Sequence, residues 1–387
     1  MRPDGGAFPR MTPNIPFNRP HFPEKAFELM RDAAETRRHV SGDGHYTREC
    51  ESWMEGRLGA PRVLLVNSCT SALEMALILL RVGPGDEVVV PSFTFVSCAN
   101  VVALRGATPV FADIDPDTLS MSTATIEPCI TDRTRAVMQV HYGGTVRDLS
   151  DVTAYCASRE IRLIEDAAHA FLGEWMGRPL GTWGSVGAFS FHETKNFSMG
   201  EGGALVVNDA DLVERAEIVR EKGTNRKQFR QGIVDKYSWV DLAASYVASD
   251  LLAAMLWAQL LDSDSIRNDR LIVWRRYADS LEDWARANSV VLPPKVEWSN
   301  ITAHVFYMLM PTAEIRDRFL QSVRAEGVDA VFHYVPLADS PYGSQFSSPP
   351  CPVADDIAAR LVRLPLYVAM RPDEVSRVIE VVTHCEM

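Results

Sequence analysis

Short β-branched runs alternate with helical patterns from about residue 60 to residue 210, and this alternation constrains the fold more than any other feature. Stretches such as Ser71–Leu80 and Asp151–Ala157 carry apolar residues at helical spacing. Parallel strands need a crossover, usually a helix, so the pattern predicts an α/β fold with a mostly parallel sheet between helices. The runs that we interpret as strands are Val63–Val66, Glu87–Val90, Pro109–Asp113, Ala136–His141, Arg162–Glu165, Gly187–Phe191 and Ala204–Val207.

Polar or aromatic side chains follow five of these runs, or stand at their ends. In open α/β sheets, ligands bind beyond the carboxyl ends of the strands. We therefore expect the five groups to meet at one crevice. They are Ser68–Thr70, Phe93–Phe95, His141, Asp166–His169 and Ser190–Lys195.

The rhythm changes after about residue 275, where longer helical patterns surround two isolated strand candidates, Val305–Leu309 and Ala330–Tyr334. This change predicts a smaller α+β domain behind the large one. The N-terminus is rich in Pro, Gly and Asn and has no apolar segment of the kind found in signal peptides, so we interpret it as a loose arm. The expected division is an arm over residues 1–20, a large domain over 21–270 and a small domain over 271–387.

The charge of the chain limits its partners. With 387 residues and a formal net charge of −12, its average surface repels nucleic acid and anionic membranes, so neither is expected as a partner. The most apolar stretch, Leu251–Leu261, is too short to span a bilayer and predicts a buried helix. The seven cysteines have no metal-ligand spacing, which favours free thiols, no metal site and a cytoplasmic location.

Lys195 is one of only six lysines in the chain. It follows the apolar run Val186–Phe191 and precedes the glycine-rich stretch Gly200–Gly203, where the backbone can approach a ligand. A desolvated lysine in a crevice has a lowered pKa and becomes nucleophilic toward an aldehyde. The alternative is an ordinary solvated lysine.

Each of the other candidate residues also has a structural interpretation. Asp166 could cap a helix, or its carboxylate could keep a pyridine nitrogen protonated. Ser68–Ser71 could cap the helix that follows, or present free amides to a phosphate, with Ser190 as a further donor. Phe95 could belong to the core, or stack on a planar ring.

Several other functions lack their motifs. Gly83–Asp86 is a turn and no glycine fingerprint of a dinucleotide site occurs, which argues against a Rossmann-type dehydrogenase or epimerase. His192 and Glu193 have no second histidine at the spacing of a zinc helix.

The order of the candidate motifs is more specific than any one of them. A phosphate turn, a stacking aromatic, Asp-x-x-His, and Ser-x₄-Lys before a glycine loop together resemble the DegT/DnrJ-type nucleotide-sugar aminotransferases, over residues 15–387. The resemblance implies fold type I architecture, with a mixed, mostly parallel sheet, and pyridoxal 5′-phosphate (PLP) as cofactor. Phrases such as Phe191-His-Glu-Thr-Lys-Asn and Arg220-Glu-Lys-Gly-Thr-Asn-Arg are similar to those of the transaminases that act on dTDP-4-keto-6-deoxyglucose.

The resemblance also implies site roles. Lys195 becomes the Schiff-base lysine and proton shuttle, and Asp166 the partner of the pyridinium nitrogen. His169 would bind the ring hydroxyl, and Phe95 would stack on the ring. Ser190 and the amides of Cys69 and Thr70 would hold the cofactor phosphate, and His333 and Tyr334 fall in a substrate-side motif.

Members of this family are homodimers with shared active sites, so the segment 222–245 is expected to reach the partner's site. Lys222 and Arg226 would then face substrate phosphates, and Ser245 the cofactor phosphate. This chain departs from the family at three places. Cys69 replaces a glycine in the phosphate turn, Ser245 replaces the phosphate-contacting asparagine, and Ala338 replaces a histidine.

The reaction implied is transfer of an amino group from L-glutamate, through pyridoxamine phosphate, to the C4 ketone of dTDP-4-keto-6-deoxy-D-glucose, which gives a dTDP-4-amino-4,6-dideoxyhexose. The alternatives are another nucleotide-linked keto sugar, a PLP-dependent sugar dehydratase and a non-catalytic relative. Dehydratases carry histidine where this chain has Lys195, and the intact Lys195, Asp166 and Ser190 argue against a non-catalytic role. The sequence leaves the C4 configuration of the product, gluco or galacto, open.

Overall fold

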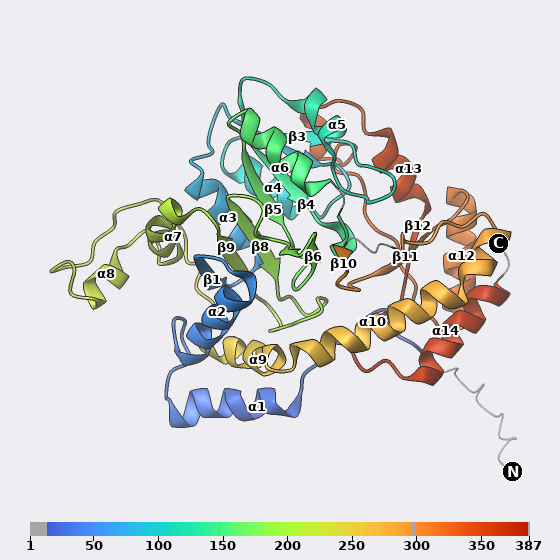
Figure 1. The fold of residues 1–387 in the computed structure, drawn as a ribbon, viewed down its shortest axis with the longest axis horizontal. Coiled ribbons are helices and arrows are strands. Elements are labelled where there is room, and N and C mark those ends of the chain that lie inside the picture. The colour runs from blue at the N-terminus through green and yellow to red at the C-terminus, as the bar shows by residue number, and fades with distance from the viewer. Residues whose placement is uncertain (1–13, 147, 296–298, 386–387) are drawn as a thin grey trace, which may run out of the picture.

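A seven-stranded sheet forms the centre of the molecule in the computed structural model, which describes residues 14–146, 148–295 and 299–385. The strand order is β1-β9-β8-β5-β4-β2-β3, with β9 antiparallel to both neighbours and the other pairs parallel (Figure 1). The predicted strand runs are confirmed. Their bounds are β1 Arg62–Val66, β2 Glu87–Pro91, β3 Thr108–Ala112, β4 Thr134–Val140, β5 Arg162–Asp166, β8 Val186–Ser190 and β9 Gly203–Val207.

Both faces of this sheet are buried, as its continuous apolar strands require. In β1, Leu64 and Val66 point into a core shared with the helices α3, α4 and α7, whereas Val63 and Leu65 point into a core shared with α2 and α9. The helices of the central part are α1 Glu24–Arg31, α2 His45–Leu58, α3 Cys69–Leu79, α4 Ser97–Leu104, α5 Thr123–Ile126, α6 Leu149–Ser158, α7 Val213–Arg220, α8 Arg226–Arg230 and α9 Asp250–Leu260.

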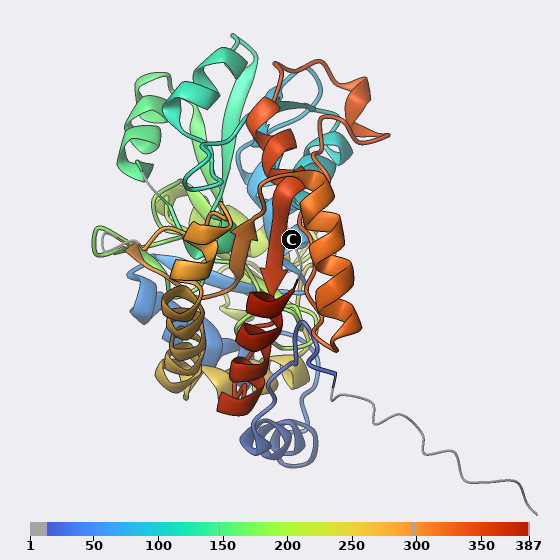
Figure 2. The same ribbon diagram turned by 90° about the vertical axis from the view of Figure 1, so that its right-hand side faces the viewer.

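The C-terminal elements lie together on one side of the molecule (Figures 1 and 2). Helix α10 runs unbroken through the expected domain boundary near residue 270 and leads from the large sheet into this layer. The division into two domains stays a prediction. The C-terminal elements are α10 Ser263–Ser280, α11 Glu282–Ala287, α12 Ala313–Ala325, α13 Pro352–Arg360 and α14 Pro372–His384, with the antiparallel pair β11 Phe306–Leu309 and β12 Leu361–Leu364. A small three-stranded sheet joins β10 Ser299–Asn300 to β6 Glu174–Trp175 and β7 Arg178–Pro179, which belong to the connection between β5 and β8.

The predicted strand Ala330–Tyr334 is wrong. This segment makes a single backbone bridge, between Val331 and Arg363 of β12, and then leaves the sheet. It does so because it passes along the wall of a cavity that His333 and Tyr334 line. Pro336, two residues further on, has no N–H with which to continue a ladder.

The described part of the expected loose arm is packed against the body of the protein. Ile15 is buried and bridges Val328, and its N–H donates to the carbonyl of Gly327 over 2.8 Å. Residues 14–20 are therefore not loose, because this backbone pairing and the buried Ile15 side chain hold them. Residues 1–13 lie outside the described part of the chain.

The expectation that His141 lies in the crevice at the strand ends is also wrong. Its imidazole is fully buried and binds Glu165 over 2.8 Å, and the ring does not line the cavity. The Glu165 carboxylate also accepts the backbone N–H groups of Gly181, Trp183 and Gly184. This pair therefore anchors the loop between β5 and β8.

Of the helices in the described residues, none is long and apolar enough to cross a membrane.

Candidate active site

A cavity of about 610 Å³ opens at the carboxyl ends of β1, β5 and β8. Four of the five predicted strand-end groups meet there, since Ser68–Thr70, Phe95, Asp166, His169 and Ser190–Lys195 all contribute lining side chains. The C-terminal layer closes the opposite wall with His304, His333, Tyr334 and Arg363. The described N-terminal segment adds Phe17 and Asn18.

Lys195 lies in this cavity, in a loop whose backbone is fixed on both sides. The N–H of Glu193 donates to Gly200, and Asn196 donates to the carbonyl of Thr302 over 2.8 Å. Burial lowers the pKa of Lys195 to about 8, although the nearby Asp166 and Cys69 raise it. The neutral, nucleophilic form of the amine is therefore accessible near neutral pH.

Asp166 ends β5 and points into the cavity. Its Oδ1 accepts the N–H of Ala168 over 3.0 Å, and its Oδ2 accepts a hydrogen bond from the Cys98 thiol over 3.0 Å. A turn, rather than a helix, follows the strand, so the helix-cap alternative for Asp166 is wrong. Burial and the carboxylate raise the pKa of Cys98, which keeps the thiol protonated as a donor.

The start of α3 forms a cradle suited to an anion. Ser68 caps the helix by accepting the N–H of Ser71 over 3.0 Å, which confirms the cap interpretation, and the phosphate interpretation stays a prediction. Cys69 and Thr70 occupy the first helical turn, where amides have no intrahelical partner and the helix dipole favours negative charge. Gly203 lies directly behind it, and a Cβ there would come within 2.5 Å of the Cys69 nitrogen.

Three histidines line the cavity side by side. The rings of His169 and His304 are 4.2 Å apart, and those of His169 and His333 are stacked 6.2 Å apart. Burial lowers the pKa of each of the three, so they are neutral. Nδ1 of His169 accepts the N–H of Gly143 over 3.3 Å, which places its proton on Nε2. His169 can therefore donate a hydrogen bond from Nε2.

Phe95 lines the cavity and does not belong to the core. It is 57% exposed, and its ring centre lies 6.4 Å from that of Tyr334. Phe93, two residues earlier, is instead fully buried against Tyr142. The Phe95 ring therefore has a free face for stacking.

Ser245, Lys222 and Arg226 do not line the cavity of this single chain. They belong to the segment 222–245, which protrudes from the body around α8 (Figure 1). Ser245 lies at its base, where its carbonyl accepts a hydrogen bond from Asn67 over 3.2 Å. Their roles across a dimer interface stay predictions.

Sequence reasoning missed Arg363, Arg270, His304 and Cys98, all of which line or contact the site. Arg363 lies on β12, within the stretch Arg-Leu-Pro-Leu-Tyr, and His304 lies next to β11. Both are far along the chain from the motifs. A signal for Arg363 exists: it is a cation inside the apolar strand Leu361–Leu364.

The profile of the DegT/DnrJ/EryC1/StrS aminotransferase family matches residues 23–383. The chain belongs to this family. It is therefore a fold type I, PLP-dependent aminotransferase, as the motifs predict.

Individual relatives from the DegT/DnrJ/EryC1/StrS family match this chain over nearly its whole length. A dTDP-4-dehydro-2,3,6-trideoxy-D-glucose 4-aminotransferase of Saccharopolyspora spinosa is 31% identical over 87% of this chain and 88% of its own. The aminotransferase TlmJ of Streptoalloteichus hindustanus superimposes with a TM-score of 0.87, at 30% identity, over 96% and 97% of the two chains. The PLP form of a putative sugar aminotransferase, Spr1654 of Streptococcus pneumoniae, has a TM-score of 0.87 at 26% identity, over 96% and 98%.

The residues of the cavity fit PLP. The aldehyde of PLP requires an amine, and its pyridine nitrogen requires a carboxylate. Its ring hydroxyl requires a neutral hydrogen-bond donor, and its phosphate requires free backbone amides. Lys195, Asp166, His169 and the start of α3 supply these groups within one cavity. The close approach of Gly203 to the start of α3 leaves no room for a side chain at this position.

Proposed function

We propose that this aminotransferase transfers the amino group of L-glutamate to C4 of dTDP-4-keto-6-deoxy-D-glucose. The observation that carries the proposal is Lys195, a buried amine with a lowered pKa that shares its cavity with the Asp166 carboxylate. Lysine rather than histidine at this position favours amination over dehydration of the sugar. The Saccharopolyspora relative, whose name specifies another dTDP-4-keto sugar, supports the nucleotide and the C4 position.

PLP, when bound, supplies an aldehyde that exchanges amino groups and a ring that withdraws electrons from the reacting carbon. Lys195 would hold it covalently through Nζ. Once released, the same amine is placed to move a proton between the substrate carbon and the cofactor carbon, because Asn196 and Glu193 fix the loop on both sides.

Asp166 would keep the ring nitrogen protonated. Its two oxygens already accept hydrogen bonds from Cys98 and Ala168, so the carboxylate is oriented before any ligand binds. His169 would donate from Nε2 to the ring hydroxyl, and Phe95 would cover one face of the ring. Ser190 and the amides of Cys69 and Thr70 would hold the phosphate.

His333 and Tyr334 would contact the substrate from the opposite wall. The Nδ1 atom of His333 lies 3.1 Å from the Tyr142 hydroxyl, which fixes the imidazole ring. The rings of His333 and Tyr334 stack with centres 3.6 Å apart. A rigid wall of this kind suits the positioning of a sugar ring.

The protein would act as a homodimer in the cytoplasm. The segment 222–245 exposes apolar side chains that a monomer would leave in water, among them Ile233 at 66% and Trp239 at 77% exposure. Pairing of two chains would cover them and bring Lys222, Arg226 and Ser245 toward the partner's cavity.

A second candidate substrate is another nucleotide-linked keto sugar, such as the 2,3,6-trideoxy sugar named in the Saccharopolyspora relative. The two candidates differ in the sugar hydroxyls at C2 and C3. Competition between the two keto sugars for one enzyme sample, read as the ratio of their kcat/KM values, separates them.

Incubation with dTDP-4-keto-6-deoxyglucose and glutamate tests the proposal directly. Mass spectrometry is expected to find an aminated nucleotide sugar, and NMR coupling constants distinguish an equatorial from an axial amine at C4. Absence of any aminated product, with the same enzyme still consuming glutamate, would contradict the sugar assignment.

A further inference from the structure

The imidazole of His304 carries a hydrogen-bond acceptor into the active-site cavity. The carbonyl of Thr302 can only accept, so the group of Asn196 that lies 2.8 Å from it is the amide Nδ2. The other end of this amide, Oδ1, therefore faces His304, and Nδ1 of His304 must donate to it over 2.9 Å. Burial lowers the pKa of His304, so the ring carries one proton and Nε2 is left as an acceptor.

The direction of this acceptor is fixed by the protein. Arg270 donates to the backbone carbonyls of Ala303 and His304 over 3.1 and 2.8 Å, and Asn196 holds the ring at Nδ1. His304 lines the cavity, and within the part of the chain that the structure describes its Nε2 makes no hydrogen bond. A ligand in the cavity therefore meets an acceptor that is already oriented.

The neighbouring histidine has the opposite tautomer. Nδ1 of His169 accepts the N–H of Gly143, so its Nε2 carries the proton and donates. The ring centres of His169 and His304 are 4.2 Å apart. The cavity thus presents one imidazole donor and one imidazole acceptor side by side, and the acceptor suits a ligand group that brings its own hydrogen.

The group that meets His304 lies next to the reacting carbon. Asn196, which binds the ring, follows Lys195 in the chain, and the charge of Lys195 lowers the pKa of His304 further. In a 4-keto-6-deoxyhexose, the keto carbon C4 has two neighbours in the sugar ring. C5 carries a methyl group and the ring oxygen, neither of which donates a hydrogen bond. C3 carries a hydroxyl, which does.

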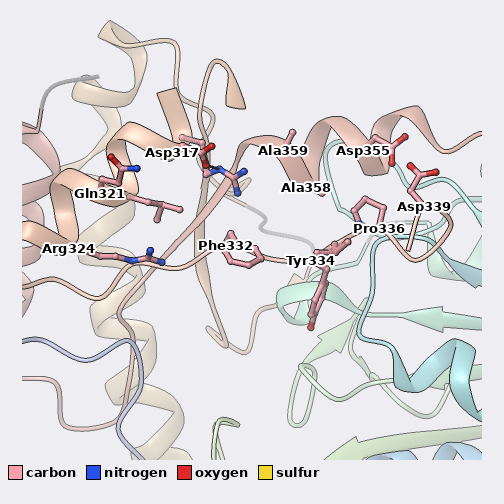
Figure 3. A pocket seen from close by; sticks show the side chains of 13 residues that line it. Asp317, Gln321, Arg324, Phe332, Tyr334, Pro336, Asp339, Asp355, Ala358 and Ala359 are labelled. Carbon is pink, nitrogen blue, oxygen red and sulfur yellow. Dashed lines mark ion pairs between the residues drawn. The ribbon is translucent and has the colours of Figure 1, made fainter. Parts of the chain in front are cut away.

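A second hollow of similar size offers no such arrangement. The groove of about 720 Å³ along α12 and α13 shares Tyr334 with the cavity, and Figure 3 shows the side chains that line it. Among the described residues of this lining there is no lysine and no histidine. The reacting end of the sugar is therefore expected beside Lys195, and the groove supplies a control.

We propose that His304 determines substrate specificity by accepting, at Nε2, the hydrogen of the sugar hydroxyl on C3, beside the keto carbon. A site built to bind a hydroxyl rejects the analogue that lacks it, because the buried acceptor then stays unpaired. The enzyme is therefore expected to prefer dTDP-4-keto-6-deoxyglucose to a 3-deoxy sugar such as the one named in the Saccharopolyspora relative. The inference rests on the proposed function, because it takes C4 as the carbon that meets Lys195.

Calorimetric titration of the PLP-loaded protein with two unreactive nucleotide sugars tests the proposal. dTDP-6-deoxyglucose has a hydroxyl in place of the ketone, so it cannot be aminated, and dTDP-3,6-dideoxyglucose lacks the C3 hydroxyl as well. We expect the wild type to bind the second compound at least about 10-fold more weakly than the first. His304→Phe keeps a ring but has no acceptor, and should reduce this ratio to less than about 3-fold.

The ratio of the two dissociation constants separates a contact with the sugar from a role in folding, because a disturbed cavity would weaken both titrations equally. His304→Gln should retain part of the ratio, since one amide hydrogen can replace Nδ1–H toward Asn196 and the amide oxygen remains an acceptor. Should His304→Phe not fold, Asn196→Ala decides the question. It releases the tautomer of His304, and the ratio should fall at least about 3-fold.

Two variants serve as controls. His21→Phe removes a half-buried imidazole that does not line the cavity. Arg324→Met removes a charge from the groove along α12 and α13 (Figure 3). Both are expected to leave both dissociation constants unchanged.

Equal weakening of both titrations by His304→Phe, with the ratio preserved, would overturn the proposal, since it would assign the ring to Lys195 or to packing. Equal affinities of the wild type for the two compounds would overturn it as well. The proposed function is judged separately, by amination of dTDP-4-keto-6-deoxyglucose. Amination without discrimination at C3 refutes only the role of His304, and discrimination that depends on His304 without amination refutes only the proposed reaction.

Discussion

The amine of a lysine attacks an aldehyde only in its neutral form, so the pKa of Lys195 sets the pH dependence of cofactor attachment. Burial lowers this pKa to about 8, so the protonated form dominates below that pH. When apoprotein is mixed with PLP, the rate constant for the appearance of visible absorption is expected to rise about tenfold per pH unit below pH 8. Above that pH it should level off.

Two variants control this measurement. Lys195→Ala should give no covalent band at any pH, and Lys25→Ala, at an exposed lysine outside the segment 222–245, should behave like the wild type. A plateau that begins only near pH 10.5, the usual pKa of lysine, would show that Lys195 is not desolvated in the apoprotein.

Which residues the sequence could predict depended on their distance along the chain. Lys195, Asp166, His169 and Ser190 stand in motifs with fixed local spacing, and the structure brings them into one cavity. Arg363, His304 and Cys98 reach the site through tertiary packing, and of the three only Arg363, a cation inside an apolar strand, carries a local signal in the sequence. His141 was misassigned because a strand end alone does not reveal that the next strand carries a buried acid, Glu165.

At the scale of elements, the approach of β9 to α3 controls the proposed phosphate cradle. A Cβ on Gly203 would come within 2.5 Å of the Cys69 nitrogen and 2.6 Å of the Ser68 carbonyl carbon, so Gly203→Ala must push the start of the helix away. We expect this change to weaken PLP binding at least about 10-fold and to destabilise the apoprotein by about 1–3 kcal/mol. Equilibrium dialysis and urea unfolding measure the two effects.

Gly56→Ala is the matched control, because this glycine lies inside α2 with open space around its Cβ position. Its substitution should leave PLP affinity unchanged and stabilise the helix by about 0.5–1 kcal/mol. Equal PLP affinities for the Gly203 variant and the wild type would mean that the phosphate binds elsewhere.

A buried ion network joins α2, β1 and α7. Arg220 is 1% exposed and binds Glu51 and Glu217, which also bind Arg62 over 2.7 and 2.6 Å. Arg220→Met leaves these carboxylates with too little positive charge. We expect it to lower the free energy of unfolding by about 3–5 kcal/mol, as judged by urea denaturation.

The exposed pairs of Arg286 with Glu282 and Asp283 provide the comparison. Because water screens them, Arg286→Met should change the free energy of unfolding by less than about 1 kcal/mol. Similar losses for both variants would contradict the importance assigned to burial.

Element types were predictable where the period was regular. Strands of the large sheet are continuous apolar runs bounded by turns, and these survive in the structure with shifts of one or two residues. Ala330–Tyr334 has the same composition, but its backbone partner, Arg363, allows a single bridge before the segment turns to the cavity. An apolar, β-branched composition does not reveal whether a neighbouring strand is placed to pair with the segment.

For the whole molecule, the exposed apolar side chains of the segment 222–245 predict association. Trp239 is 77% exposed at the base of this segment, so Trp239→Asp is expected to place a charge in the interface and to shift the protein from dimer to monomer. Sedimentation equilibrium should then give the mass of one chain, 43.1 kDa, instead of twice that value.

Tyr342→Asp serves as control, because Tyr342 is 66% exposed and lies outside the segment 222–245, just before the short turn Gly343–Gln345. It should leave the dimer intact. A wild-type protein that sediments as a monomer at micromolar concentration would contradict the shared active site.

The position of β1 in the sheet has a consequence for biosynthesis. Among the strands of the large sheet, β1 pairs only with β9, which the ribosome makes much later, whereas β2, β3, β4 and β5 can pair as they emerge. The edge of the nascent sheet therefore stays open until Gly203–Val207 has left the exit tunnel. The two halves of the phosphate cradle, at α3 and at Gly203, meet only then. Cofactor capture is therefore expected only after β9 has been made, and ligand bound to the folded chain then stabilises it by mass action.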